Sequence, residues 1–353
     1  MKKIGIALAA CAVVAAVLYS VRAPLSTAVM GRALEATMSS SLLDTLPDGL
    51  HVVLCGAGGP LPDPVRSGPC VAVIAGQTMV TVDAGSGGAR NLNPLALPVG
   101  RVDAVFLTHF HSDHIDGLGE LATLRWASAA HTEPLAVYGP EGVDEVVTGF
   151  NQSYAPDTVY RHAHHGDMVA PLSGRGLRAF SHPSPAEGEA TVVYDENGLR
   201  VQMIRVEHAP VEPAVAYLFS YKGRSALVSG DTIKSANLQK FAKDVDLLVH
   251  EGLSPVLVQQ MHKAALRAGN DIVAKITSDI PDYHTTPVEA AEIARDAGVG
   301  HLLFYHVVPP TPIPGLLAAW SAGVDDFFKD YTIGVDGTGF SLPADSTDIL
   351  RID

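Results

Sequence analysis

The sequence predicts a mixed α/β fold in which two β-sheets are covered by helices on both sides. Short apolar runs rich in β-branched residues recur along the chain, and several of them pair as hairpins. Longer runs between them have the apolar spacing of helices. Alternating strands and helices of this kind pack as layers around a common core. A polar cluster, LTHFHSDHIDGLGEL over residues 107–121, lies at a strand-to-helix turn and marks a candidate site.

The composition is that of a folded, acidic protein. Of the 353 residues, 47% are hydrophobic and 18% are charged, and the formal net charge is −14. This balance excludes a disordered chain. It gives no sign of the basic face that a general nucleic-acid binder needs, so nucleic acid is the less favoured partner. The sequence leaves open whether the chain pairs as a homodimer.

The N-terminus is predicted to be separate from the folded domain. Two lysines precede residues 4–21, an uncharged apolar run. This pattern predicts an uncleaved membrane anchor over residues 1–22, with a cleaved signal peptide as the alternative. The basic start stays inside, so the rest of the chain would face the periplasm or the cell exterior. Residues 23–48 are expected to form a connector.

The folded domain is predicted over residues 49–353. Its expected elements are, in order, strand HVVLCG, a hairpin over 71–85, strand 102–107, helix 117–129, strand LAVYG, helix 141–153, hairpins turning at Asn197-Gly198 and Lys222-Gly223, strand DVDLLVHE, helices 254–268 and 287–297, and strand HLLFYH. Residues 155–190 are rich in Pro, Gly and His without a period, which predicts an insertion or cap. Cys55 and Cys70 flank a Gly/Pro-rich loop, and the sequence does not decide whether they form a disulfide.

The polar cluster has the spacing of metal ligands. His109, His111, Asp113 and His114 form the motif H-x-H-x-D-H. Side chains two apart in an extended turn point the same way, so the first two histidines can share one metal ion. The aspartate and the last histidine, just past the bend, can share a second. Neutral imidazole and carboxylate suit zinc, and manganese or iron also bind such sites, so we expect two divalent metal ions, zinc first.

Three further candidate ligands close apolar runs. His208 ends RVEH, Asp231 ends ALVSGD and His306 ends HLLFYH. Each would emerge at the same rim of a sheet. Together they complete a three-ligand set for each metal ion, with one bridging carboxylate.

In this order of motifs the sequence resembles the metallo-β-lactamase superfamily, over about residues 50–343. The resemblance implies a four-layer αβ/βα sandwich with the metal ions at one edge. The ligands it implies are His109, His111 and His208 for the first metal ion, Asp113, His114 and His306 for the second, and Asp231 as the bridge.

Within the superfamily the sequence looks like the ribonuclease Z and arylsulfatase-like branch. The bridging Asp231 argues against β-lactamase activity, and LCGAGGPLPDP, VSGDT, LLVHE and YHTTP look like motifs of that branch. The resemblance implies that His284 lies near the leaving group, that Glu251 orients it and that His250 lines the site nearby. It also implies that Asp83 orients a metal ligand.

One departure from ribonuclease Z lies between His114 and His208. Ribonuclease Z carries a long basic arm that grips transfer RNA, whereas RHAHHGDMVAPLSGRG has arginines and no lysine-rich arm. We therefore expect a dinuclear hydrolase that cleaves phosphodiester or sulfate esters of a small molecule or aryl compound. Attack of a metal-bridged hydroxide would break the ester, and Asp113 would also accept the proton of the attacking water.

Four alternatives accompany this expectation. Two are ribonuclease Z-type processing of transfer RNA 3′ ends and hydrolysis of a lactone or thioester. A redox di-iron protein is disfavoured because that class usually has glutamate where His111 stands. A non-catalytic, membrane-tethered binding module is disfavoured because no ligand is missing.

Overall fold

The described part of the chain comprises two units. The structure, a computed structural model, describes residues 2–39, 41–313 and 315–352. The chain divides into Met1–Leu42 and Leu43–Asp353. The second unit contains all of the predicted site residues.

The first unit consists mainly of α1 (Lys2–Ser39), so the expected connector over residues 23–48 is helical as far as Ser39. The membrane anchor expected over residues 1–22 falls mostly on side chains outside the described part of the structure. Within the described part, none of the helices combines the length and the apolar character needed to cross a membrane. The exported, membrane-anchored location predicted from residues 1–22 is wrong, because it disagrees with the relatives of this chain that are reported with the metal centre below.

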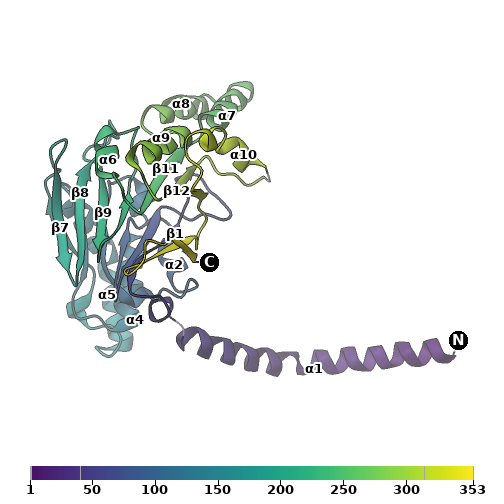
Figure 1. The fold of residues 1–353 in the computed structure, drawn as a ribbon. Coiled ribbons are helices and arrows are strands. Elements are labelled where there is room, and N and C mark those ends of the chain that lie inside the picture. Colours follow the sequence, from purple (N-terminus) through teal and green to yellow (C-terminus); the bar gives the residue numbers. More distant parts are fainter. Residues whose placement is uncertain (1, 40, 314, 353) are drawn as a thin grey trace. The chain divides into compact units, whose positions relative to one another are not determined.

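Two mixed β-sheets form the second unit, as the sequence predicts (Figure 1). The first sheet contains, in spatial order, β15 (Leu350–Ile352), β14 (Gly339–Pro343), β1 (Gly49–Gly56), β2 (Cys70–Ala75), β3 (Thr78–Val82), β4 (Val102–Phe106), β5 (Leu135–Pro140) and β6 (Leu177–His182). The second contains β13 (Tyr331–Ile333), β12 (His301–Val308), β11 (Leu247–Leu253), β10 (Arg224–Val228), β9 (Val215–Tyr221), β8 (Leu199–Arg205) and β7 (Ala190–Glu196). Strands β3 to β6 are parallel, and so are β10 to β13. The ends of parallel strands form a shared rim, where ligands commonly bind.

Helices cover the outer face of each sheet, which gives the four layers of the predicted sandwich. The first sheet is covered by α2 (Gly88–Leu92), α4 (Leu118–Ala129) and α5 (Val143–His165), and the second by α6 (Ala236–Phe241) and α9 (Pro287–Ala297) (Figure 1). The helices α7 (Pro255–Arg267) and α8 (Asp271–Asp279) pack against each other as a hairpin. The remaining short helices are α3 (Ser112–Ile115) and α10 (Leu316–Trp320).

The main core lies between the two sheets. Leu54 and Val73 of the first sheet and Val201 and Phe219 of the second belong to one cluster of buried side chains. Phe106, the last residue of β4, packs edge to face on Phe219, with the ring centroids 5.8 Å apart. Burial of this apolar surface is the main favourable term in folding. It also fixes the position of the β4 end, which the polar cluster follows.

The two predicted hairpins in the second sheet are confirmed. Asn197 and Gly198, between β7 and β8, have φ values of 55° and 82°. Lys222 and Gly223, between β9 and β10, have φ values of 45° and 79°. Positive φ at both central residues matches the right-handed twist of the flanking strands, and Gly in the second position adopts it without strain.

Residues 155–190 differ from the predicted insertion or cap. They extend α5 as far as His165, and residues 177–182 form the edge strand β6. The helical period is weak in the sequence because Thr158 is the only described residue buried in the second half of α5, which also contains Pro156. A helix that is mostly solvent-exposed has no continuous apolar stripe to reveal it.

A disulfide joins Cys55, near the end of β1, to Cys70, at the start of β2. Both residues are buried, and the bond closes the loop between them. The sequence alone did not decide whether this disulfide forms. A cross-link over a separation of 15 residues restricts the unfolded chain. We therefore expect Cys55→Ala/Cys70→Ala to lower the free energy of unfolding by about 3 kcal/mol.

Urea denaturation of the double variant would measure this loss as a lower midpoint. Cys11→Ala is the control, because Cys11 is exposed and unpaired. A double variant with the midpoint of the parent would show that the disulfide contributes nothing to stability.

Candidate metal centre

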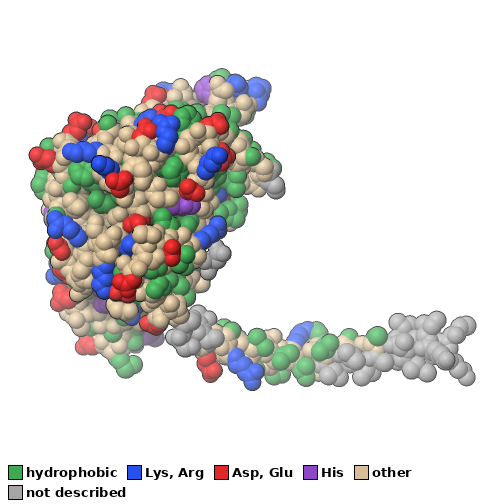
Figure 2. All heavy atoms as spheres, viewed as in Figure 1, with side chains coloured by type: hydrophobic (Ala, Val, Ile, Leu, Met, Phe, Trp, Pro, Cys, Tyr) green, Lys and Arg blue, Asp and Glu red, His purple; other side chains and the backbone are tan. Residues whose placement is uncertain are grey.

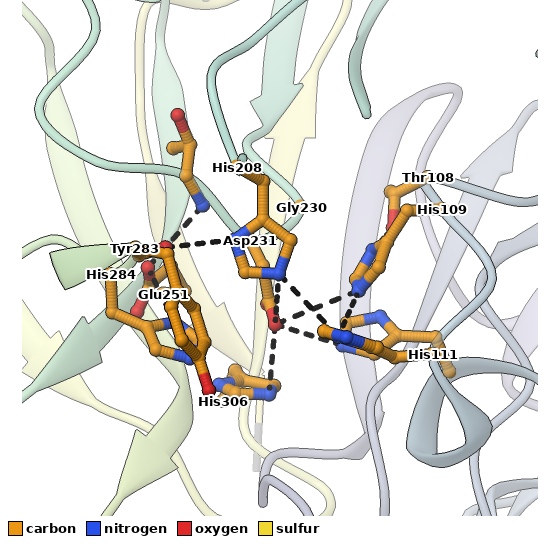
Figure 3. Close-up of polar contacts among 12 residues, drawn as sticks. Thr108, His109, His111, His208, Gly230, Asp231, Glu251, Tyr283, His284 and His306 are labelled. Atoms are coloured by element: carbon orange, nitrogen blue, oxygen red, sulfur yellow. Dashed lines mark hydrogen bonds and ion pairs between the residues drawn. The ribbon is translucent and has the colours of Figure 1, made fainter. Parts of the chain in front are cut away.

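Polar side chains from both sheets meet at one rim of the sandwich (Figure 3). The residues that follow or end strands are His109 and His111 after β4, His208 after β8, Asp231 after β10 and His306 within β12. Asp113 and His114 lie on α3, directly after the β4 loop. All seven predicted metal ligands therefore come together, although their positions span almost 200 residues from His109 to His306.

The seven side chains form two groups. The nitrogen and oxygen atoms that His109, His111, His208 and Asp231 offer lie within 4.8 Å of one another. Asp113, His114 and His306 form a second group with the same spacing. These are the two ligand sets that the sequence resemblance implies.

Asp231 lies between the two groups. Its Oδ2 atom is 3.8 Å from His109 Nε2 and 3.9 Å from His208 Nε2, on the side of the first group. The same oxygen is 3.3 Å from His114 Nε2 and 3.4 Å from His306 Nε2, on the side of the second group. One carboxylate that reaches both sets is the arrangement that a bridging ligand requires.

Several polar atoms at the centre lack a hydrogen-bond partner among the described residues. Asp231 Oδ1 and His114 Nε2 are both buried, and neither atom makes a well-aligned hydrogen bond to a described residue. Leaving such atoms unsatisfied in a protein interior is costly, and a bound cation removes that cost. The donor set of imidazole nitrogens and carboxylate oxygens fits a divalent transition metal.

Residues around the ligands orient their rings. His114 Nδ1 lies 2.8 Å from Asp83 Oδ2, which directs the opposite nitrogen of the ring to the centre. Thr108 Oγ1 donates to the same carboxylate at 2.9 Å and lies 3.0 Å from His109 Nδ1. Asp83 therefore positions one histidine directly and a second histidine through Thr108. The sequence did not lead us to predict a role for Thr108. The only sequence signal for Thr108 is its position between the strand and the first histidine.

A backbone group orients a third ligand. His208 Nδ1 donates to the carbonyl oxygen of Tyr283 at 2.8 Å, and the rings of these residues are 5.2 Å apart. No side-chain pattern can reveal a backbone acceptor, so the sequence offers no signal for this contact.

Two residues of the centre have left-handed backbone geometry. Asp83 has a φ of 59° and His306 a φ of 44°. Such conformations cost on the order of 1–3 kcal/mol for residues other than glycine and occur often at functional sites. A Cβ atom on Gly59 would lie 3.0 Å from His306 Cε1, so the early glycine-rich loop packs closely against this ligand.

Burial and neighbouring charges set the protonation of the ligands. Burial holds the pKa of His109 well below its usual range, and nearby imidazoles lower it further. Burial also lowers the pKa of His111 and of His208. For Asp231, burial raises the pKa, but His306 and His114 lower it more, so the net shift is well below the usual value. For His114, burial lowers the pKa, but the Asp231 and Asp83 carboxylates raise it more, to well above the usual value. Metal binding requires a neutral imidazole and an ionised carboxylate, so a bound cation would displace the proton of His114.

His284 and Glu251 form a pair beside the centre. His284 Nδ1 lies 3.0 Å from Glu251 Oε1, which also accepts a hydrogen bond from the Thr285 backbone amide at 2.9 Å. Burial lowers the pKa of His284, but the Glu251 carboxylate raises it more strongly, to about 9. His250, expected to line the site, is fully buried, and its Nδ1 lies 2.9 Å from the Glu251 carbonyl oxygen.

His284 also lies within reach of the metal ligands. Together with Asp231 and His306 it forms a third group of side chains whose ligand atoms lie within 4.8 Å of one another. The geometry therefore allows His284 either to act on the substrate or to bind a metal ion. The metal content of a variant separates these two roles.

We expect Asp83→Asn to weaken metal binding without preventing folding. Asparagine tolerates positive φ, but the substitution removes the charge that holds the ring of His114 and the hydroxyl of Thr108. Loss of such an orienting carboxylate typically lowers metal affinity by about 10–100-fold. Competition with a chelator measures this change. Asp103→Asn is the control, because Asp103 accepts a hydrogen bond from the Met79 amide and takes no part in the ligand groups. Equal affinities for Asp83→Asn and the parent would refute the role of Asp83.

Comparison with known proteins agrees with this geometry. Residues 63–276 match the Metallo-beta-lactamase superfamily. Ribonuclease Z of Mycobacterium bovis is 33% identical over 275 residues, which cover 77% of this chain and 91% of that protein. Ribonuclease Z of Mycolicibacterium gilvum is 33% identical over 293 residues, covering 81% of this chain and 94% of that protein.

Solved structures share the fold at lower identity. A metallo-beta-lactamase fold protein from Bacillus subtilis has a TM-score of 0.60 at 18% identity, and covers 83% of this chain and 100% of its own. The short form of human tRNase Z has a TM-score of 0.57 at 21% identity, with 83% and 99% covered. The sequence match over most of the chain and the shared fold confirm the resemblance: the chain belongs to the metallo-β-lactamase superfamily and, within it, is similar to ribonuclease Z.

Proposed function

We propose that this protein is a dinuclear phosphodiesterase of the ribonuclease Z type that cleaves RNA, with zinc as the first metal to test. The central observation is that Asp231 reaches both ligand groups while the His284–Glu251 pair lies beside them. The chain is 33% identical to a ribonuclease Z over 91% of the length of that protein, which favours a phosphodiester in RNA as the substrate over the expected aryl ester. The sulfate-ester part of the expectation has no comparable support.

The two metal ions, when bound, supply an activated water and neutralise charge on the substrate oxygens. The residues of the chain transfer the protons. Glu251 holds the Nδ1 proton of His284, so that His284 Nε2 can donate a proton to the departing alcohol oxygen. Asp113, which is less deeply buried than Asp231, is placed to accept a proton from the attacking water.

A second candidate is a phosphodiesterase for small aryl substrates. One observation favours it: no lysine occurs between His114 and His208, the segment that carries the RNA-gripping arm in ribonuclease Z. On the face of the second unit that Figure 2 shows, acidic and basic side chains are interspersed. Such a face offers no continuous basic track for a polyanion.

A substrate comparison tests the proposal. The full chain, loaded with zinc or manganese, is assayed on a transfer-RNA precursor with a 3′ trailer, on bis(4-nitrophenyl) phosphate, on 4-nitrophenyl sulfate and on a lactone. We expect cleavage of the RNA at one position and cleavage of the diester. Cleavage of the diester alone supports the second candidate. Turnover of only the sulfate or the lactone would refute both.

A further inference from the structure

An apolar pocket of about 180 Å³ adjoins the metal centre. The polar side consists of residues already placed at the centre, among them Asp113, Asp231 and His284. The opposite side is formed by the α7–α8 hairpin and the early glycine-rich loop. Met261 comes from α7, and Ile276 comes from α8. A cavity of this size is comparable to the roughly 150 Å³ apolar cavity that holds one benzene ring.

The wall formed by the hairpin has no free polar group to offer a substrate. None of the residues lining the pocket is a lysine or an arginine. Thr277 is the polar exception on α8, but its hydroxyl donates to the Val273 carbonyl at 2.7 Å and lies 3.1 Å from His262 Nδ1. The pocket therefore favours an uncharged, apolar group over a phosphate.

The position of His284 shows which part of a substrate reaches this pocket. His284 lines the pocket, and in the proposed function it protonates the departing oxygen. The Tyr283 ring lies beside the His284 ring (Figure 3), with the ring centroids 4.9 Å apart, and both residues line the pocket. Aromatic rings stack on one another in offset or edge-to-face contacts, so this half-buried phenol suits a flat partner.

We propose that the α7–α8 hairpin and Tyr283 form a subsite for an uncharged aromatic ring carried by the departing alcohol. This inference rests on the proposed function, because it assigns the pocket to the leaving-group side of the same reaction. Two sources share this chemistry: the nucleobase of the nucleoside whose 3′ oxygen departs, and the ring of an aryl ester.

The kinetic test uses Ile276→Asn and a matched control. Ile276 lines the pocket and is 52% exposed, so a smaller polar residue is tolerated in the fold. Ile272 lies one turn earlier on the same helix, is 74% exposed and does not line the pocket, so Ile272→Asn is the control. The substrates are bis(4-nitrophenyl) phosphate and a short RNA whose departing nucleoside either carries its base or is abasic.

We expect Ile276→Asn to raise KM by about five- to tenfold for ring-bearing substrates and to leave kcat nearly unchanged. The abasic RNA should have a high KM already with the parent and should not respond to the substitution. A response with RNA identifies a nucleobase site, and a response with the aryl diester alone identifies an aryl site. Equal KM values for the base-carrying and abasic RNA, with no response to the aryl diester, would overturn the proposal.

A binding measurement separates the pocket from the reaction. Saturation-transfer NMR on the full chain should detect benzyl alcohol and adenosine bound to the parent and to Ile272→Asn, and a weaker signal for Ile276→Asn. If this pattern appears without any phosphodiester cleavage, the proposed function fails and the pocket stands. If cleavage occurs but neither ring binds, the proposed function stands and the pocket assignment fails.

Discussion

Replacing Asp231 with alanine is expected to release at least one metal ion and to reduce kcat/KM by on the order of 10³-fold or more. Asp231 Oδ2 lies within 3.9 Å of ligand nitrogens in both groups, so its loss removes a ligand from each. A bound metal contributes several kcal/mol to stabilising charge in the transition state, which sets the size of the effect. Elemental analysis of the purified variant measures the metal, and hydrolysis of bis(4-nitrophenyl) phosphate measures the activity.

The matched control is Asp246→Ala. Asp246 is a carboxylate that pairs with the buried Arg224 at 2.8 Å and lies outside the ligand groups. This variant should lose stability and retain both metal ions. Near two equivalents of metal in Asp231→Ala would contradict a bridging role, and a parent that binds no transition metal after reconstitution would refute the metal centre altogether.

Replacing His284 with alanine is expected to leave both metal ions in place and to lower turnover by about 10²–10⁴-fold. This range is the usual contribution of a positioned general acid. The loss should be smaller for nitrophenolate leaving groups, because a good leaving group departs with little help from a proton. It should be largest for an alcohol such as the 3′ oxygen of RNA.

Two comparisons make this result decisive. His306→Ala should lose metal and should reduce activity equally for good and poor leaving groups, because His306 belongs to the second ligand group. Glu251→Gln should behave as a weaker form of His284→Ala, since the amide oxygen can still accept a hydrogen bond but no longer raises the pKa of His284. Missing metal and an equal loss across the leaving-group series in His284→Ala would show that this histidine is a ligand.

The prediction against nucleic acid rests on overall composition, which is a weak guide to the charge at a site. The net charge of −14 is a sum over the whole chain, whereas binding depends on local charge at the site. The similarity to ribonuclease Z outweighs that sum and makes RNA the first substrate to test. The missing basic arm remains a real departure, and the substrate comparison addresses it directly.

The sequence by itself determined the fold class and was enough to predict the candidate ligand residues. His109, His111, Asp113 and His114 are close in the chain, so their joint chemistry is visible without a structure. Hairpin turns are equally local, because the glycine of Asn197-Gly198 and of Lys222-Gly223 adopts positive φ without strain between two strand-like runs. Strand-like and helix-like periods then indicated two layered sheets, and the structure confirms this.

Only the tertiary structure decided what surrounds those ligands. Thr108 and the Tyr283 carbonyl orient histidines through contacts that carry no side-chain signature. The exposed second half of α5 lacks the apolar stripe that would announce a helix. The pocket wall exists because α7 and α8 fold back beside residues far away in the chain, such as His111. A local pattern names the reactive groups, but packing between distant segments determines which of their atoms face the substrate and what shape that substrate must have.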